Sequence, residues 1–171
     1  SVHTEEVAAE NVYNTPELAA ECAVEYVNEG FTAVKLDPAG PYTVHGGRQP
    51  RLADIDLSVR MLAAVREAVG GRADILFGTH GQFTAAGAIR MARAIERFDP
   101  LWFEEPVPPD APEAMARVAR ATSIPVATGE RLATKWEFAR IIELGAAAIL
   151  QPDLGRSGGI LETRKIAAMA E

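Results

Sequence analysis

Cysteine and long apolar runs are scarce in this sequence, and each shortage excludes a class of protein. The 171 residues include one cysteine, Cys22, which cannot form a disulfide within the chain or a zinc site built from several thiolates. A reducing compartment, and hence a cytoplasmic location, is therefore expected. No stretch approaches the roughly 20 apolar residues that a membrane-spanning helix needs. Residues 1–14 lack the basic start and apolar core of a signal peptide.

Basic residues are outnumbered, and phosphate-binding glycine motifs are missing. The 17 Lys and Arg against 24 Asp and Glu leave a net charge of −7, which argues against binding to nucleic acid or to an anionic membrane. Neither Gly-x-Gly-x-x-Gly after an apolar run nor the P-loop pattern Gly-x-x-x-x-Gly-Lys-Ser/Thr occurs. A dinucleotide-binding or P-loop fold therefore has no fingerprint here. The hydrophobic content of 48% is typical of a globular protein.

Short apolar runs alternate with helical patterns along the chain. The apolar runs predict strands at 31–36, 73–77, 101–103, 124–127 and 147–150, and the helical patterns lie at 15–29, 54–69, 84–97, 111–120, 134–144 and from 159 onward. Thr15 is the expected N-cap of the first helix, with Pro16 in its first turn. Strands that are apolar along nearly their whole length are typical of parallel sheets. The regular repeat favours an α/β fold, a partial (β/α) TIM-type barrel with about five of eight strands, over an open doubly wound sheet.

Polar side chains follow the apolar part of each predicted strand. They are Lys35 and Asp37, then Gly78-Thr79-His80, Glu104-Glu105, Glu130-Arg131 and Gln151-Pro152-Asp153. Four of these ends, at 78, 104, 130 and 153, are 26, 26 and 23 residues apart. In a parallel barrel the strand ends meet on one face, where active sites are built. So many charged groups at one mouth need a ligand or a metal ion to balance them.

Glu104 and Glu130 place two carboxylates one strand apart. Carboxylate oxygens suit a hard cation such as Mg²⁺, which keeps positions open for water and substrate. Such an ion could bind a substrate carboxylate and stabilise the enediolate that forms when the neighbouring proton is removed. A histidine, a lysine or a His–Asp pair at adjacent strand ends would supply the acid and the base.

Three motifs and their spacing resemble one known family. Phe103-Glu104-Glu105-Pro106, Gly129-Glu130-Arg131 and Gln151-Pro152-Asp153, followed by Gly158-Gly159-Ile160, are similar to motifs of the enolase superfamily. The likeness is to its mandelate racemase/muconate lactonizing group, and there to the galactonate dehydratase-like sugar-acid dehydratases. It spans about 15–171 and implies part of a modified (β/α)7β barrel, after a lead-in segment at 1–14. We expect the family's N-terminal capping domain and last barrel strands to lie outside this sequence.

The resemblance also implies roles for individual residues. Glu104 and Glu130 match the family's second and third metal-binding carboxylates. Asp153 matches an aspartate that orients a catalytic histidine, the base, which the family carries on the strand that would follow this sequence. His80 matches the general acid that helps the hydroxyl depart in sugar-acid dehydratases.

Two positions depart from the family pattern. Lys35 keeps the first lysine of a family Lys-x-Lys pair, whereas Asp37 replaces the second. Both are expected to bind substrate, and Asp37 could touch a hydroxyl or carry a proton. Gly78 stands where the family has its first metal-ligand aspartate, and one carboxylate fewer should lower the affinity for a divalent ion. His80 or a substrate carboxylate would then complete the shell, and a Gly78→Asp variant should gain magnesium affinity.

The function that this pattern predicts is metal-assisted dehydration of a sugar acid to a 2-keto-3-deoxy acid, with Mg²⁺ as cofactor. Two alternatives of the same class stay open: cycloisomerisation of a sugar lactone or anhydro sugar acid, and racemisation or epimerisation. A different alternative is a non-catalytic homologue with a degraded metal site. The expected partner is a small acid sugar, with no nucleic acid or membrane, and a homo-oligomer is expected.

The remaining polar and aromatic residues have supporting roles in this interpretation. Glu105 should point away from the preceding glutamate in a strand and support the site from behind. Arg131 is expected to pair with a neighbouring carboxylate, with contact to substrate as the alternative. Trp102 and Trp136 are expected to pack in the core or between helix and strand. Two histidines are expected at the surface or in loops: His3 and His45.

Overall fold

The computed structural model describes residues 11–40 and 47–171. Its helices and strands, in chain order, are α1 (Pro16–Asn28), β1 (Ala33–Leu36), α2 (Leu52–Val69), β2 (Asp74–Gly78), α3 (Ala85–Ile95), β3 (Trp102–Glu104), α4 (Pro112–Ala119), β4 (Val126–Thr128), α5 (Thr134–Glu143), β5 (Ile149–Leu150) and α6 (Ile160–Ala170). Two short 3₁₀ turns, η1 (Gly70–Arg72) and η2 (Glu96–Phe98), follow α2 and α3. The predicted alternation is confirmed. No helix of the described residues combines the length and apolar content needed to cross a membrane.

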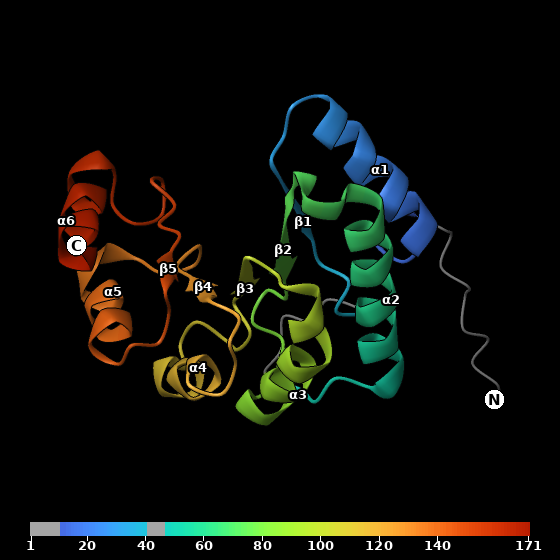
Figure 1. Ribbon diagram of the computed structural model, residues 1–171. Coiled ribbons are helices and arrows are strands. Elements are labelled where there is room, and N and C mark those ends of the chain that lie inside the picture. Colours follow the sequence, from blue (N-terminus) through green and yellow to red (C-terminus); the bar gives the residue numbers. More distant parts are fainter. Residues whose placement is uncertain (1–10, 41–46) are drawn as a thin grey trace, which may run out of the picture.

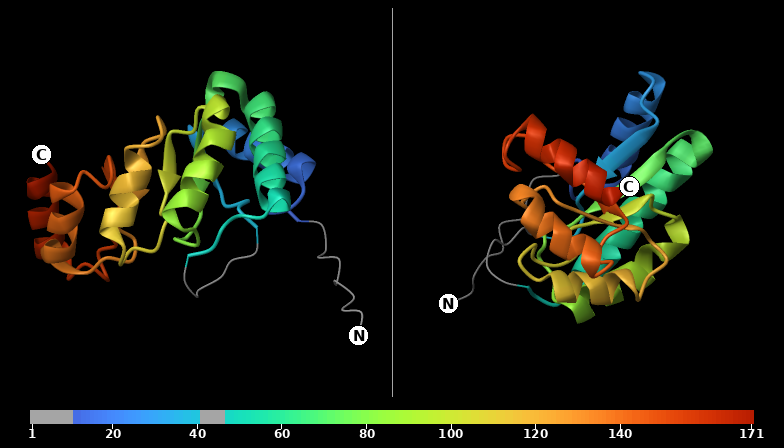
Figure 2. Two further views of the ribbon diagram at one scale, coloured as in Figure 1. Left: turned by 90° about the horizontal axis from the view of Figure 1, so that it is seen from below. Right: turned by 90° about the vertical axis from the view of Figure 1, so that its left-hand side faces the viewer.

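The five strands form one parallel sheet in the order β1-β2-β3-β4-β5. Figure 1 shows the strands following an arc, with α1 and α2 on one flank, α3 and α4 below, and α5 and α6 on the other flank. The left view of Figure 2 shows the helices from α2 to α6 beside one another in chain order. Sequential parallel strands with helices outside them are part of a β/α barrel, so the predicted fold class is confirmed.

The outer face of the sheet packs against the helices through aromatic and aliphatic side chains. Phe77 of β2 and Phe103 of β3 are neighbours in the register, are fully buried, and their rings meet edge to face at 5.5 Å. Met61 of α2 and Met91 of α3 are also fully buried. Because side chains alternate along a strand, the residues next to these phenylalanines point to the inner face. That face carries the polar groups.

Two local expectations need correction. Thr15 is the N-cap of α1, but its hydroxyl donates to Asn14 Oδ1 at 3.0 Å and caps no helical N–H. Trp136, expected to be packed, is 72% exposed. The buried side of α5 runs through Phe138 and Ile141, and the 3.6-residue period of a helix turns position 136 away from that side.

Candidate functional site

One row of inner-face residues crosses the carboxyl end of the sheet. Gly78 of β2 is paired in register with Glu104 of β3. The β1–β2 register, continued by one residue, brings Asp37 to the other side of Gly78. Lys35, two residues before Asp37, projects to the same face. With His80 in the turn after β2, four predicted site residues from three adjacent strands come together.

Glu104 is the centre of this cluster and is only 3% exposed. Its Oε1 forms an ion pair with Lys35 Nζ, and its Oε2 accepts hydrogen bonds from Gln151 Nε2 at 2.9 Å and Trp102 Nε1 at 3.2 Å. Burial alone would raise the pKa of Glu104, but these donors outweigh it and hold the pKa below its ordinary value. Sequence reasoning missed the roles of Trp102 and Gln151. The two-residue spacing of Trp102 and Glu104 on one strand was the available signal.

Asp37 lies among charges of both signs. Its Oδ2 is 3.4 Å from His80 Nδ1. Burial raises the pKa of Asp37, and the carboxylates of Glu104 and Glu130 add to the rise, although His80 and Lys35 oppose it. Burial lowers the pKa of Lys35, but the hydrogen bond to Glu104 and the nearby carboxylates outweigh it and leave that pKa raised. The raised pKa of Lys35 keeps it an ammonium. The raised pKa of Asp37 means that its charged form is disfavoured, so a further positive group nearby would stabilise it.

The turn that carries His80 is fastened from β3 and β4. His80 has a φ of 51°, in the left-handed region that non-glycine residues rarely adopt. Arg131 Nη2 donates to the His80 carbonyl at 2.9 Å, and Arg131 Nε donates to Glu105 Oε2 at 2.7 Å. The N–H of Gly81 donates to the Glu105 carbonyl at 2.6 Å. The expected pairing of Arg131 and the supporting role of Glu105 are both confirmed.

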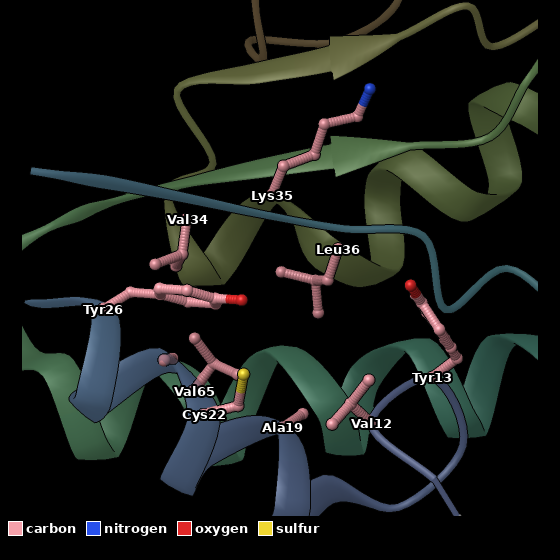
Figure 3. Close-up of a pocket in the computed structure, with 10 residues that line it drawn as sticks. Val12, Tyr13, Ala19, Cys22, Tyr26, Val34, Lys35, Leu36 and Val65 are labelled. Carbon is pink, nitrogen blue, oxygen red and sulfur yellow. The ribbon is translucent and has the colours of Figure 1, made fainter. Parts of the chain in front are cut away.

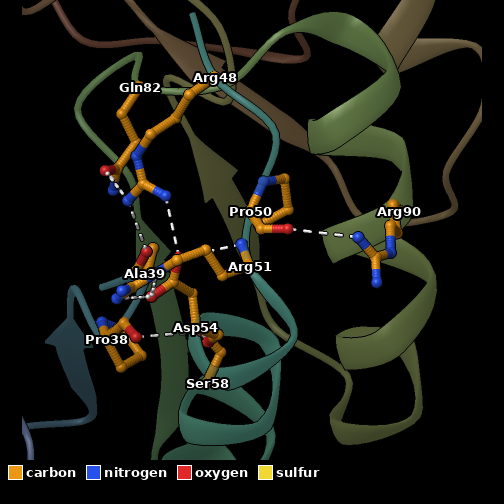
Figure 4. A network of polar contacts seen from close by, with 9 residues as sticks. All are labelled: Pro38, Ala39, Arg48, Pro50, Arg51, Asp54, Ser58, Gln82 and Arg90. Atoms are coloured by element: carbon orange, nitrogen blue, oxygen red, sulfur yellow. Dashed lines mark hydrogen bonds and ion pairs between the residues drawn. The ribbon is translucent and has the colours of Figure 1, made fainter. Parts of the chain in front are cut away.

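The segment that follows β1 is anchored by hydrogen bonds from α2 and from Arg48, which precedes α2 in the chain. Ser58 Oγ donates to the Pro38 carbonyl at 3.1 Å, and Arg48 Nη2 donates to the Ala39 carbonyl at 3.4 Å. Asp54, which is buried, accepts a hydrogen bond from Arg48 Nη1 at 2.9 Å. Figure 4 shows these contacts meeting at the start of α2. The main chain just beyond the site is therefore held in place.

Two pockets border β1 and the segment that follows it. One, of about 270 Å³, is lined by Tyr13, Asp37, Gly40, His80 and Gln82. The other, of about 190 Å³, lies between α1 and β1 and is lined mostly by apolar side chains such as Val34 and Leu36. Figure 3 shows the Lys35 ammonium projecting away from this apolar pocket. The first pocket, with a carboxylate and an imidazole in its wall, is the one suited to a polar ligand.

Two predicted site residues make no hydrogen bond or ion pair with the cluster around Glu104 among the described residues. Glu130, after β4, is exposed, and its carboxylate makes no hydrogen bond or ion pair with the described residues. Asp153, after β5, is also exposed, and its Oδ1 accepts the N–H of Arg156 at 2.9 Å. The two remaining histidines, His3 and His45, lie outside the described residues.

The donor atoms near Glu104 fit a hard cation. Within residues 11–40 and 47–171, no three His, Cys, Asp or Glu side chains are already gathered around one metal position. Asp37 Oδ1 and Gln151 Oε1 are nevertheless buried without a hydrogen-bond partner among those residues. Carboxylate and amide oxygens are the ligands that Mg²⁺ prefers. The chemistry of the donors therefore suits such an ion.

The chain is similar in sequence to known proteins. Residues 17–171 match the family described as enolase C-terminal domain-like. The chain belongs to this family. Over 174 residues it is 39% identical to a D-xylonate dehydratase from Haloferax volcanii, covering 99% of this chain and 41% of that protein. Over 117 residues it is 48% identical to a D-galactonate dehydratase from Variovorax paradoxus, covering 68% of this chain and 31% of that protein.

Solved structures of enolase-family proteins agree with the fold. A mandelate racemase/muconate lactonizing enzyme from Sulfitobacter sp. superimposes with a TM-score of 0.92 at 60% identity, covering 99% of this chain and 42% of that chain. A second from Jannaschia sp. CCS1 gives 0.91 at 58% identity, covering 95% and 43%. The resemblance drawn from the strand-end motifs is confirmed. The chain spans less than half the length of the relatives described here.

Proposed function

We propose that the protein removes the proton next to the carboxylate of a sugar acid and expels the β-hydroxyl as water, giving a 2-keto-3-deoxy acid. The observation that carries this proposal is the cluster of Lys35, Asp37, His80 and Glu104 at the ends of three adjacent parallel strands. Relatives named sugar-acid dehydratases support the same choice. Because the chain spans less than half of their length, the activity is proposed for the whole protein.

Divalent-cation binding is assigned to Glu104 and Glu130, with Mg²⁺ as the ion that oxygen ligands favour. When bound, such an ion would offset the charge of the substrate carboxylate and the negative charge that develops beside it as the proton leaves. Lys35 adds a positive group of its own, since its raised pKa keeps it an ammonium. An ammonium within the cluster can hold a substrate carboxylate by a charge-assisted hydrogen bond.

His80 is the proposed general acid for the departing hydroxyl. Asp37 Oδ2 lies 3.4 Å from Nδ1 of His80, which orients the ring and assigns proton transfer to Nε2. Both side chains line the pocket of about 270 Å³, so a hydroxyl bound there would approach the imidazole. Asp153 is proposed to orient the base that takes the first proton.

The test incubates the full-length protein in deuterated water with Mg²⁺ and with the sugar acids that appear in the names of related dehydratases: D-xylonate, D-galactonate and D-gluconate. Exchange of the proton next to the carboxylate is followed by NMR, and the keto acid by mass. His80→Asn should keep exchange and slow dehydration by about 10²–10⁴-fold, because it removes only the acid. Glu104→Gln should lose both reactions, whereas Glu67→Gln on the exposed face of α2 should keep both.

The possible products separate the alternatives. A product of unchanged mass would identify a cycloisomerase or an epimerase instead of a dehydratase. A protein that binds no divalent ion, exchanges no proton and forms no keto acid with any of the three acids would refute the proposal.

A further inference from the structure

The space next to Gly78 is filled by a carboxylate from the neighbouring strand. A Cβ atom on Gly78 would lie 1.6 Å from Asp37 Oδ1 and 3.1 Å from Lys35 Cε. Any side chain at position 78 would therefore displace the Asp37 carboxylate. Gly78 does not have a positive φ, so the local backbone conformation does not require glycine. The limit on position 78 comes instead from the Asp37 carboxylate, which occupies the space of a Cβ atom.

Asp37 Oδ1 is a buried oxygen without a hydrogen-bond partner among the described residues. The ammonium of Lys35 is engaged with Glu104, and His80 faces the other oxygen of Asp37. Burying a carboxylate oxygen with no donor is unfavourable. The nearby carboxylates of Glu104 and Glu130 make it more so, since both disfavour further negative charge at Asp37. A cation between Asp37 and Glu104 would relieve this repulsion.

We propose that Asp37, through Oδ1, is a ligand of the divalent cation assigned to Glu104, and that Gly78 is a glycine because it makes room for this carboxylate. The inference rests on the proposed function in that it needs that cation. The Asp37 carboxylate would replace the negative charge that is lost with glycine at position 78, through an oxygen that comes from the end of the adjacent strand. The sequence alone predicts that Gly78→Asp gains magnesium affinity. The structure predicts a loss, because the new side chain and Asp37 would occupy the same space.

The main chain beyond Asp37 is anchored in a way that suits a ligand. The carbonyls of the next two residues, Pro38 and Ala39, accept hydrogen bonds from Ser58 and Arg48. A side chain on a fixed backbone loses less freedom when it binds an ion, so less of the binding energy is lost to ordering. Because the main chain is held there, the Asp37 carboxylate is the part that must move when position 78 gains a side chain.

The test measures Mn²⁺ binding to the full-length protein by electron paramagnetic resonance, with Mg²⁺ as competitor. Asp37→Asn keeps the shape of the side chain and removes its charge, so it should weaken Mn²⁺ binding by about tenfold or more. Asp56→Asn is the matched control, because Asp56 is an exposed carboxylate on α2, and it should leave binding unchanged. The measurement is of ion binding and does not depend on turnover.

A double-variant cycle tests the shared space. Gly78→Ala adds only the Cβ atom that would meet Asp37 and should weaken Mn²⁺ binding about as much as Asp37→Ala does. Added to Asp37→Ala, it should have no further effect, because the two changes act on one contact. Gly71→Ala is the matched glycine control, since no described atom lies within 4 Å of its Cβ position, and it should be silent.

Glu104→Gln separates this inference from the proposed function. If Glu104→Gln abolishes Mn²⁺ binding while Asp37→Asn and Gly78→Ala leave it unchanged, Asp37 is not a ligand and the assigned cation still stands. If the unaltered protein binds no Mn²⁺, the cation assignment fails and the inference fails with it. If circular dichroism shows that Asp37→Asn does not fold, the effect of Gly78→Ala on Mn²⁺ binding decides whether Asp37 is a ligand, because this variant keeps every carboxylate of the site.

Discussion

Replacing Arg131 should both destabilise the protein and release the turn that carries His80. Arg131 donates to Glu105 Oε2 from Nε at 2.7 Å and lies 2.6 Å from it through Nη2, which also donates to the His80 carbonyl at 2.9 Å. Glu105 is fully buried, and its Oε1 has no hydrogen-bond partner among the described residues. Arg131→Met keeps much of the side-chain volume and deletes every donor. The Glu105 carboxylate would then be buried without its cation.

The size of the loss follows from the unequal burial of the two partners. Removing one partner of a fully buried ion pair costs about 3–5 kcal/mol, whereas an exposed pair contributes about 0.2–1 kcal/mol. The side chain of Glu105 is 1% exposed and that of Arg131 is 31% exposed, so water screens one side of the pair. We therefore expect Arg131→Met to lower the free energy of unfolding by about 2–4 kcal/mol. Glu105→Gln, which leaves a neutral acceptor, should cost about 1–2 kcal/mol.

Urea unfolding at pH 7, followed by circular dichroism, measures these differences. Arg140→Met is the matched control, because Arg140 and its partner Glu113 are 51% and 64% exposed, and it should cost less than about 1 kcal/mol. Equal losses for Arg131→Met and Arg140→Met would show that burial of Glu105 does not set the energy. In the proposed reaction, Arg131→Met should slow dehydration more than proton exchange, because the proposed acid lies on the released turn.

Three further predictions concern the core, the contact between α5 and α6, and the segment after β1. Phe103→Ala removes a buried ring that meets Phe77 edge to face and should cost about 3–5 kcal/mol in urea unfolding. The N–H of Lys135 and the ammonium of Lys165 lower the pKa of Glu162 from 4.5 to about 2. A lowered carboxyl pKa contributes stability above the unfolded pKa, and this is lost as pH falls through the folded pKa. Glu162→Gln should therefore lower the Tm at pH 7, with the difference shrinking between pH 4.5 and about 2. Asp54→Ala removes the buried acceptor of Arg48 and should speed amide exchange in residues 37–40, measured by mass spectrometry.

Each of these predictions has a contrary result. Phe31→Ala, at an exposed ring, is the control for Phe103→Ala, and similar losses would contradict the packing argument. A Tm difference for Glu162→Gln that stays constant down to pH 2.5 would show that its charge is not the source of the stability. Unchanged amide exchange in Asp54→Ala would show that the contacts at the start of α2 do not hold the segment.

Local patterns predicted most of the fold because apolar runs and strand-end motifs are local properties. Mostly apolar runs of three to six residues were enough to predict five parallel strands, and the polar residues at their ends placed Lys35 and Glu104 at one end of the sheet. The contacts that Trp102 and Gln151 make with Glu104 could not be predicted in the same way. They depend on the register between strands, which short uniform apolar runs do not determine.

Gly78 shows the same limit more sharply. In the sequence it is a missing ligand, because its neighbours along the chain carry no replacement carboxylate. In the structure Asp37, 41 positions earlier, lies beside Gly78 through pairing of β1 with β2, and it is the proposed replacement. The exposure of Trp136 is another case, since a tryptophan within a helical pattern does not reveal which side of the helix meets the sheet.

Because Asp37 and a side chain at position 78 would occupy the same space, substitutions at positions 37 and 78 are expected to be coupled in evolution. A side chain introduced at 78 while Asp37 is kept creates a collision, and loss of Asp37 while Gly78 is kept leaves neither position with a carboxylate. Moving the carboxylate from position 37 to position 78 by single substitutions therefore passes through a protein with side chains colliding at the two positions, or through one with a carboxylate at neither. The two positions should change in concert among homologues, and a chimaera that exchanges the end of β2 without the end of β1 should be defective in both directions of the exchange.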